Sequence, residues 1–153
     1  MGIRLEGVDE LMTILQQTGE KAQRGVYQQM KKEALEIQRL ARLYAPIDHG
    51  NLEDAISVEE MEGERDSRGR MGRKSVVVFV DMSQEGYEGE PIGQYAYIMH
   101  EYLAPYGKFK LGPLSQLKNK GNGKVGGKFL ERAINDVSQE MMKRLVDVAR
   151  TYY

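Results

Sequence analysis

Two long stripes of apolar residues at helical spacing constrain this chain most strongly. The first stripe runs from about residue 20 to 44, and the second runs from residue 128 to the C-terminus. Apolar side chains three or four positions apart share one face of an α-helix, so each stripe predicts an amphipathic helix of about 25 residues. The first stripe comprises Val26, Met30, Ala34, Ile37, Ala41 and Tyr44. The second comprises Phe129, Leu130, Ala133, Ile134, Val137, Met141, Leu145, Val148 and Tyr152.

A β-hairpin is predicted between the two helices. The Ala45-Pro46 pair ends the first helix, because the residue before a proline is driven out of the α region. A turn follows, in which Gly50 or Asn51 suits a positive φ. Residues 56–58 and 75–80 are rich in β-branched side chains, which favours two strands. Residues 63–74, which join them, predict a long mobile hairpin loop.

Residues 94–102 fit two patterns. Tyr95 and Tyr97 follow the alternation of a strand, whereas Tyr95, Ile98 and Tyr102 follow a helical stripe. We favour a short helix over this segment.

The segment 103–127 contains scattered glycines and lysines without a sustained period, which predicts an extended Gly/Lys-rich arm. The expected fold is therefore α+β. A small antiparallel sheet packs against two long helices, with an extended β-hairpin loop and the arm, in a single domain over residues 1–153.

Composition excludes several classes of protein. The chain has 153 residues and no cysteine, so disulfides, thiolate metal sites and cysteine nucleophiles are impossible. No stretch approaches the roughly 18 apolar residues of a membrane-spanning helix, and we expect a soluble protein without membrane contact. The net charge is -1, so any attraction to nucleic acid must come from local asymmetry. Residues 81–101 are acidic and residues 103–130 carry lysines without acids.

Candidates for catalysis are few. His100-Glu101 combines a histidine with a carboxylate, but His49 lies in a turn far along the chain, and together they give no zinc-ligand spacing. No serine lies in a nucleophile turn. The glycines between residues 121 and 128 lack the spacing of a phosphate-binding loop. We therefore expect no enzyme activity, no catalytic residue, no cofactor and no metal.

Two basic segments support an alternative function. Residues 65–74 and 108–128 could follow a phosphate backbone, with aromatic side chains stacking on bases, as in a nucleic-acid-binding accessory protein. The same lysines could instead face solvent or the acidic segment of a neighbouring subunit. The density of tyrosines between residues 95 and 106 favours a protein contact.

The order of short motifs along the chain resembles the small neck or tail-completion proteins of tailed bacteriophages. The resemblance covers about residues 5–150. The long helix is followed by Ala45-Pro46 and Gly50-Asn51-Leu52, the centre holds Tyr95-Ala96 with Glu101-Tyr102, and the last helix opens with Phe129-Leu130 and Ala133. His49 stands where that family usually has threonine.

The resemblance implies a structural subunit of a virion. Such a subunit would form a homo-oligomeric ring, sixfold or twelvefold, at the head-tail junction around the DNA channel. Its partners would be other neck and tail proteins, with transient contact to genomic DNA possible. It would be assembled in the bacterial cytoplasm and end in the virion.

Residue roles follow from the motifs and the composition. We expect subunit contacts at Tyr95, Tyr97, Glu101, Tyr102, Tyr106 and Phe109. Basic residues that would face the DNA channel or an interface are Arg65, Arg68, Arg70 and Arg73. Structural roles fall to Pro46, Gly50, Asn51 and Leu52 at the helix-to-sheet corner, and to Phe129, Leu130 and Ala133 in docking the last helix.

Overall fold

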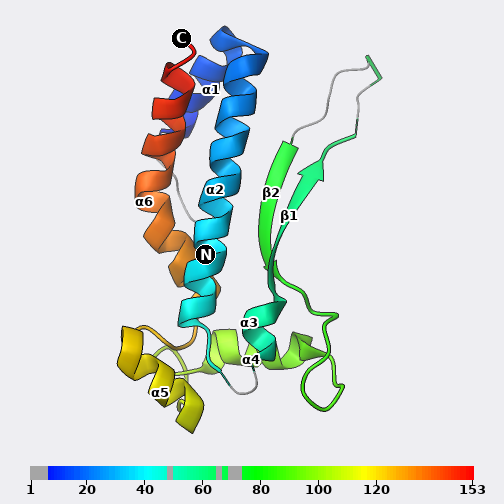
Figure 1. Cartoon of the computed structure of the whole chain (residues 1–153), viewed down its shortest axis with the longest axis vertical. Helices are drawn as coiled ribbons and strands as arrows, with labels where there is room; N and C mark the ends of the chain where they lie inside the picture. Colours follow the sequence, from blue (N-terminus) through cyan, green and yellow to red (C-terminus); the bar gives the residue numbers. More distant parts are fainter. Residues whose placement is uncertain (1–6, 48–49, 65–66, 69–73) are drawn as a thin grey trace. The chain divides into compact units, whose positions relative to one another are not determined.

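A computed structural model describes residues 7–47, 50–64, 67–68 and 74–153. The described residues form six helices and a two-stranded antiparallel sheet, which confirms the predicted α+β class (Figure 1). The helices are α1 (Val8–Thr18), α2 (Glu20–Tyr44), α3 (Asn51–Ala55), α4 (Ile92–Tyr102), α5 (Pro113–Asn122) and α6 (Phe129–Arg150), and the strands are β1 (Ile56–Glu62) and β2 (Lys74–Val80). Both predicted long helices are present as α2 and α6, and α4 confirms the helix favoured for residues 94–102.

The chain divides into two compact units, each assembled from separate stretches of sequence. The first unit holds Met1–Glu36, Glu59–Val77 and Asn135–Tyr153, and the second holds Ile37–Val58 and Val78–Ile134. Helices α2 and α6 and both strands contribute residues to each unit. The expectation of one domain over residues 1–153 stays a prediction.

The core of the first unit is a three-helix cluster. In Figure 1, α1 lies against the blue part of α2 and the red part of α6. Leu11 and Ile14 lie three positions apart on α1, and Leu145 and Ala149 lie four apart on α6, so each pair faces the same neighbour. The buried members of the cluster are Leu11, Ile14, Val26, Met142, Leu145, Val146 and Ala149.

A bidentate ion pair joins α2 to α6 within the first unit. Glu33 is only 3% exposed. Arg144 Nε donates to Glu33 Oε1 at 2.6 Å, and Arg144 Nη2 donates to Oε2 at 2.7 Å. Gln29 Nε2 donates to Oε1 at 2.7 Å. The Arg144 guanidinium, opposed by burial and assisted by Gln29, holds the pKa of the Glu33 carboxyl below its ordinary value. The buried carboxylate is therefore charged and well supplied with donors.

The sheet is also tied to α2 within the first unit. Lys31 Nζ lies 2.6 Å from Glu60 Oε1, and Tyr27 Oη donates to Glu60 Oε2 at 3.1 Å. Lys74 Nζ lies 5.3 Å from the centre of the Tyr27 ring. These polar contacts join the exposed part of the hairpin to α2.

In the second unit, the corner between α2 and β1 is closely packed. Pro46 and Leu52 are buried, and Gly50 has the positive φ (83°) that the turn was expected to need. The carbonyl oxygen of Ile56 accepts from Gln38 Nε2 and from Arg42 Nη2, both at 2.9 Å. The first residue of the sheet is thereby fixed to the end of the long helix.

The segment 103–127 differs from the predicted extended arm, because Pro113–Asn122 forms helix α5. Proline is well tolerated at the start of a helix, where its missing N–H has no partner to lose. Gly123 ends α5 with a left-handed φ of 67°. Ser115 Oγ accepts from Ile47 N at 2.9 Å and donates to Ile47 O at 3.1 Å. Polar contacts hold this helix in place, so its sequence lacks the apolar stripe from which a helix would be predicted.

The predicted mobile loop at residues 63–74 lies largely outside the described residues. Arg65, Arg70 and Arg73 fall outside them, whereas Arg68 is described and exposed. Among the helices in the described part of the chain, none has the length and apolarity needed to cross a membrane.

Candidate protein-protein interface

Helix α4 separates a buried face from an aromatic one. Ile92 and Ala96 are buried, four positions apart on the inner side. Tyr97 and Tyr102 lie on the exposed side, and their rings meet edge to face with centroids 6.3 Å apart. This is a favourable arrangement for two aromatic rings, and it orders both side chains at the surface.

A tight turn after α4 adds two further exposed aromatic residues. Phe109 N donates to Tyr102 O at 2.9 Å, and Ala104 N donates to Phe109 O at 2.7 Å. A Cβ at Gly107 would lie 2.2 Å from the backbone of Tyr102, so only glycine fits there. The turn presents Tyr106 and Phe109 outward.

We call Tyr97, Tyr102, Tyr106 and Phe109 the aromatic surface. Their side chains are between 42% and 55% exposed. The Arg132 guanidinium lies 5.4 Å from the Tyr106 ring centre, and Lys108 Nζ lies 5.5 Å from that of Phe109. Such cation contacts hold rings in place without covering them. Half-exposed, ordered aromatic residues are typical of protein interfaces.

Tyr95 and Glu101, the other predicted contact residues, are only partly exposed. Glu101 is engaged within the chain: its Oε1 lies 2.8 Å from His100 Nδ1, and its Oε2 accepts from Lys128. Lys128, and then His100, lower the pKa of the Glu101 carboxyl, and Glu101 raises the pKa of Lys128. The His100 ring packs edge to face on Phe129 at 4.9 Å. Glu101 thus ties α4 to the start of α6, and its subunit contact stays a prediction.

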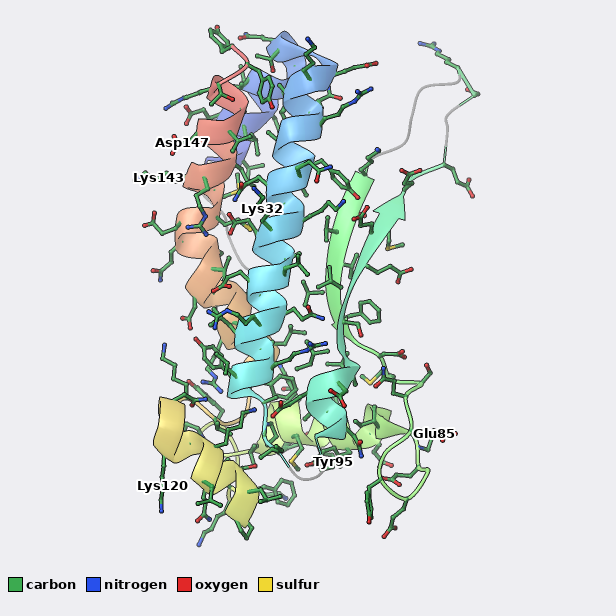
Figure 2. All side chains as sticks on the ribbon, in the orientation of Figure 1. Lys32, Glu85, Tyr95, Lys120, Lys143 and Asp147 are labelled. Carbon is green, nitrogen blue, oxygen red and sulfur yellow. The ribbon has the colours of Figure 1, made fainter. Side chains whose placement is uncertain are left out.

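The lysines of the basic segment 108–128 fall into two groups. Lys118 Nζ donates to Arg42 O at 2.6 Å, to Ala45 O at 2.7 Å and to Glu53 Oε1 at 2.5 Å, and thereby caps the carboxyl end of α2. Lys118 and Lys128 therefore serve the fold. The exposed lysines are Lys108, Lys110, Lys120 and Lys124, and Figure 2 shows Lys120 on the outer side of α5.

An apolar groove lies beside the aromatic surface. Its cavity volume is about 230 Å³. One wall comes from α4, and the other comes from the start of α5 and the chain after α2. The lining residues are Pro46, Ile47, Tyr95, Met99, Leu103, Lys110, Gly112, Pro113, Leu114 and Ser115. The groove is open and mainly apolar, so it is suited to binding an apolar group and not to catalysis.

The motif residues assigned to structure lie where packing is tight. Phe129 and Ala133 are buried, and Leu130 and Asn51 are partly buried. Gly126 N donates to Tyr44 O at 2.9 Å immediately before α6 begins. The expected role of Phe129, Leu130 and Ala133 in docking the last helix stays a prediction.

Sequence patterns gave no sign of Lys118 as a helix cap or of Met99 and Leu114 as groove walls. These residues come together only because α5 folds back toward α4.

No metal centre is suggested, because the described residues contain no cluster of three or more histidine or acidic side chains suited to a metal ion. Comparisons with protein-family models, with curated proteins and with solved structures found no match.

Proposed function

We propose that this chain is a non-enzymatic structural subunit of a tailed bacteriophage, which assembles with copies of itself into a ring at the head-tail junction. In this role it joins the head connector to the tail around the DNA channel, as a neck, tail-completion or tail-terminator protein. It is made in the bacterial cytoplasm and ends in the virion.

The exposed aromatic surface carries the proposal. Tyr97, Tyr102, Tyr106 and Phe109 are ordered by ring, cation and backbone contacts, yet each remains about half exposed. A ring subunit needs such a surface, because each copy must bury one patch of its surface against a different patch of its neighbour. The patch overlaps the central motif through which the chain resembles the phage family.

Nucleic-acid binding is supported less well. Two lysines of segment 108–128 are committed to internal contacts, and segment 65–74 is described only in part. A phosphate-tracking surface needs cations that are available to phosphate. We therefore keep this function as the rival outcome of the test.

The test is deletion of the gene from the phage or prophage that carries it, followed by negative-stain electron microscopy of the lysate. We expect separate DNA-filled heads and tails, or tails of abnormal length. A plasmid copy of the wild type should restore infectious particles. Normal particles from the deletion strain would refute the proposal, and duplex binding with a steep salt dependence would then favour the rival.

Point variants connect the phenotype to the surface. Tyr97→Ala with Tyr102→Ala should fail to complement, because truncating a central interface tyrosine commonly costs about 2 kcal/mol or more, at least tenfold in affinity. Tyr153→Ala is the matched control, since Tyr153 is an exposed tyrosine outside the aromatic surface. Equal thermal stability of the variants, measured by circular dichroism, shows that only the surface has changed. Full complementation by the double variant would contradict the assigned surface.

A further inference from the structure

The chain between β2 and α4 forms a closed turn with an aromatic residue at its tip. Glu85 and Pro91 pair as an antiparallel bridge, and Gly86 N donates to Glu90 O at 2.6 Å. Tyr87 lies at the tip and is 71% exposed. We call residues 85–91 the acidic turn, because it carries Glu85, Glu88 and Glu90 without lysine or arginine.

The acidic turn has a defined shape. Glu88 N donates to Glu90 Oε2 at 3.0 Å, and Gly89 adopts a φ of 83° that suits glycine. Glu85 and Glu88 are exposed, and no ion pair reaches either within the described part of the chain. A preformed turn loses little conformational entropy on binding. The turn therefore has the properties of a binding element.

The apolar groove has complementary properties. Tyr95 and Met99 line it from one face of α4, Leu103 lines it from the residue directly after that helix, and Leu114 lines it from α5. Lys110 forms part of its lining, and Lys108 lies two residues earlier on the same segment. Both lysines are exposed, and no carboxylate of the described residues pairs with them. An apolar floor beside cations suits an aromatic side chain flanked by carboxylates.

We propose that the groove of one copy receives the acidic turn of a second copy. The Tyr87 ring occupies the groove, and Glu85 and Glu88 face Lys108 and Lys110. This inference rests on the proposed assembly function and names the contact by which one copy holds the next. Charge complementarity selects the occupant, since the turn and the groove carry opposite charges and no ion pair among the described residues neutralises either of them.

The acidic turn and the two lysines lie at opposite ends of α4, so the charges of the turn meet the lysines of a second copy rather than those of their own chain. The acidic turn leads into Ile92, the first residue of α4, and the lysines follow Tyr102, its last residue. Eleven helical residues span about 16 Å. Figure 1 shows the loop before α4 and helix α5 at opposite ends of α4, and in Figure 2 Glu85 lies beyond Tyr95 from Lys120. A donor and an acceptor placed in this way give a head-to-tail contact, which closes into a ring when the rotation permits.

Charge reversal tests the contact with purified full-length protein. The first variant carries Glu85→Lys and Glu88→Lys, and the second carries Lys108→Glu and Lys110→Glu. Each alone opposes like charges at every contact, so self-association measured by sedimentation velocity should weaken at least about tenfold. An equimolar mixture restores opposite charges at both contacts of every subunit, so assembly should return as alternating copies. Lys32→Glu with Lys143→Glu is the matched control, because both lysines are exposed in the first unit.

Tyr87→Ala tests the apolar part of the contact, with Tyr153→Ala as its control. We expect a loss of about tenfold or more in self-association for Tyr87→Ala alone. Either charge variant associating like the wild type, or a mixture no better than its components, would overturn the inference. Assembly that stops at a dimer would overturn the head-to-tail arrangement.

Disulfide trapping covers the case of weak association. The chain contains no native cysteine, so a chain with Glu88→Cys can be mixed with a tagged chain carrying Lys110→Cys and oxidised. We expect cross-linked heterodimers well above the yield with a Lys143→Cys partner. Equal yields would refute the contact. If the deletion phenotype holds while this contact fails, the assembly function stands and only its proposed interface is wrong.

Discussion

Removing Arg144 should expose how much the first unit depends on one buried carboxylate. Glu33 is 3% exposed and receives two hydrogen bonds from Arg144 and one from Gln29. Removing one partner of a buried ion pair costs about 3–5 kcal/mol, because the other charge stays buried. The Arg144 side chain is 44% exposed, so water can partly replace it. We therefore expect Arg144→Ala to lower the free energy of unfolding by about 2–3 kcal/mol.

This loss is measurable by urea unfolding followed by circular dichroism, and should lower the melting temperature by about 4–12 °C in a chain of this size. Glu33→Gln with Arg144→Met removes both charges and should recover part of the loss. A loss below about 0.5 kcal/mol for Arg144→Ala, the usual range for surface substitutions, would refute the argument. The argument would also be refuted if the double variant lost as much free energy of unfolding as Glu33→Gln and Arg144→Met lose together as single variants.

The loss of stability in acid is an independent measurement of what the Glu33–Arg144 ion pair contributes. The folded-state pKa of Glu33 lies below its ordinary value of 4.5. Its stabilising contribution is therefore complete above pH 4.5 and is lost as the pH falls through the folded-state pKa. The wild type should lose stability in this acid window more steeply than Arg144→Ala. Parallel curves for the two proteins would assign the acid sensitivity to other carboxyl groups.

Three further substitutions, two of them with a matched control, test the second unit by urea unfolding. Lys118→Met should cost about 1.5–3 kcal/mol through its lost charge-assisted hydrogen bonds, whereas exposed Lys120→Met should stay within about 0.5 kcal/mol; equal effects would show that Lys118 does not cap α2. Gly127→Ala should cost about 1–3 kcal/mol, since its Cβ would lie 2.5 Å from a backbone oxygen. Gly121→Ala, in open space within α5, should be neutral or stabilising. Phe129→Ala should cost about 3–5 kcal/mol, and a loss under 1 kcal/mol would contradict its place in the core.

The long elements were predictable because their signals are local and repeated. Ala34, Ile37, Ala41 and Tyr44 are buried on α2, as the stripe requires. The end of α2 before Pro46 follows equally from local sterics. The apolar stripe and the proline agree on the same helix, so the prediction does not depend on any single residue.

Helix α5 was missed because its stability comes from contacts distant in sequence. Ser115 and Lys118 bond to residues near the end of α2, about seventy positions earlier. Helix propensity alone gives no sign of such contacts, and Gly121 weighs against a helix. Charge counts likewise treated Lys118 and Lys128 as surface cations, because their partners Glu53 and Glu101 lie 65 and 27 positions away in the sequence.

The ambiguity of residues 94–102 has a physical cause that bears on function. In a helix that only covers a core, the outer face is polar and the apolar stripe is distinct. On α4 the outer face carries Tyr97 and Tyr102, so apolar residues surround most of the helix and imitate the alternation of a strand. Burial of Ala96 accounts for the inner face, whereas the two tyrosines pack on each other and stay about half exposed. The position at which periodicity became ambiguous is therefore the position at which apolar side chains are available to a partner.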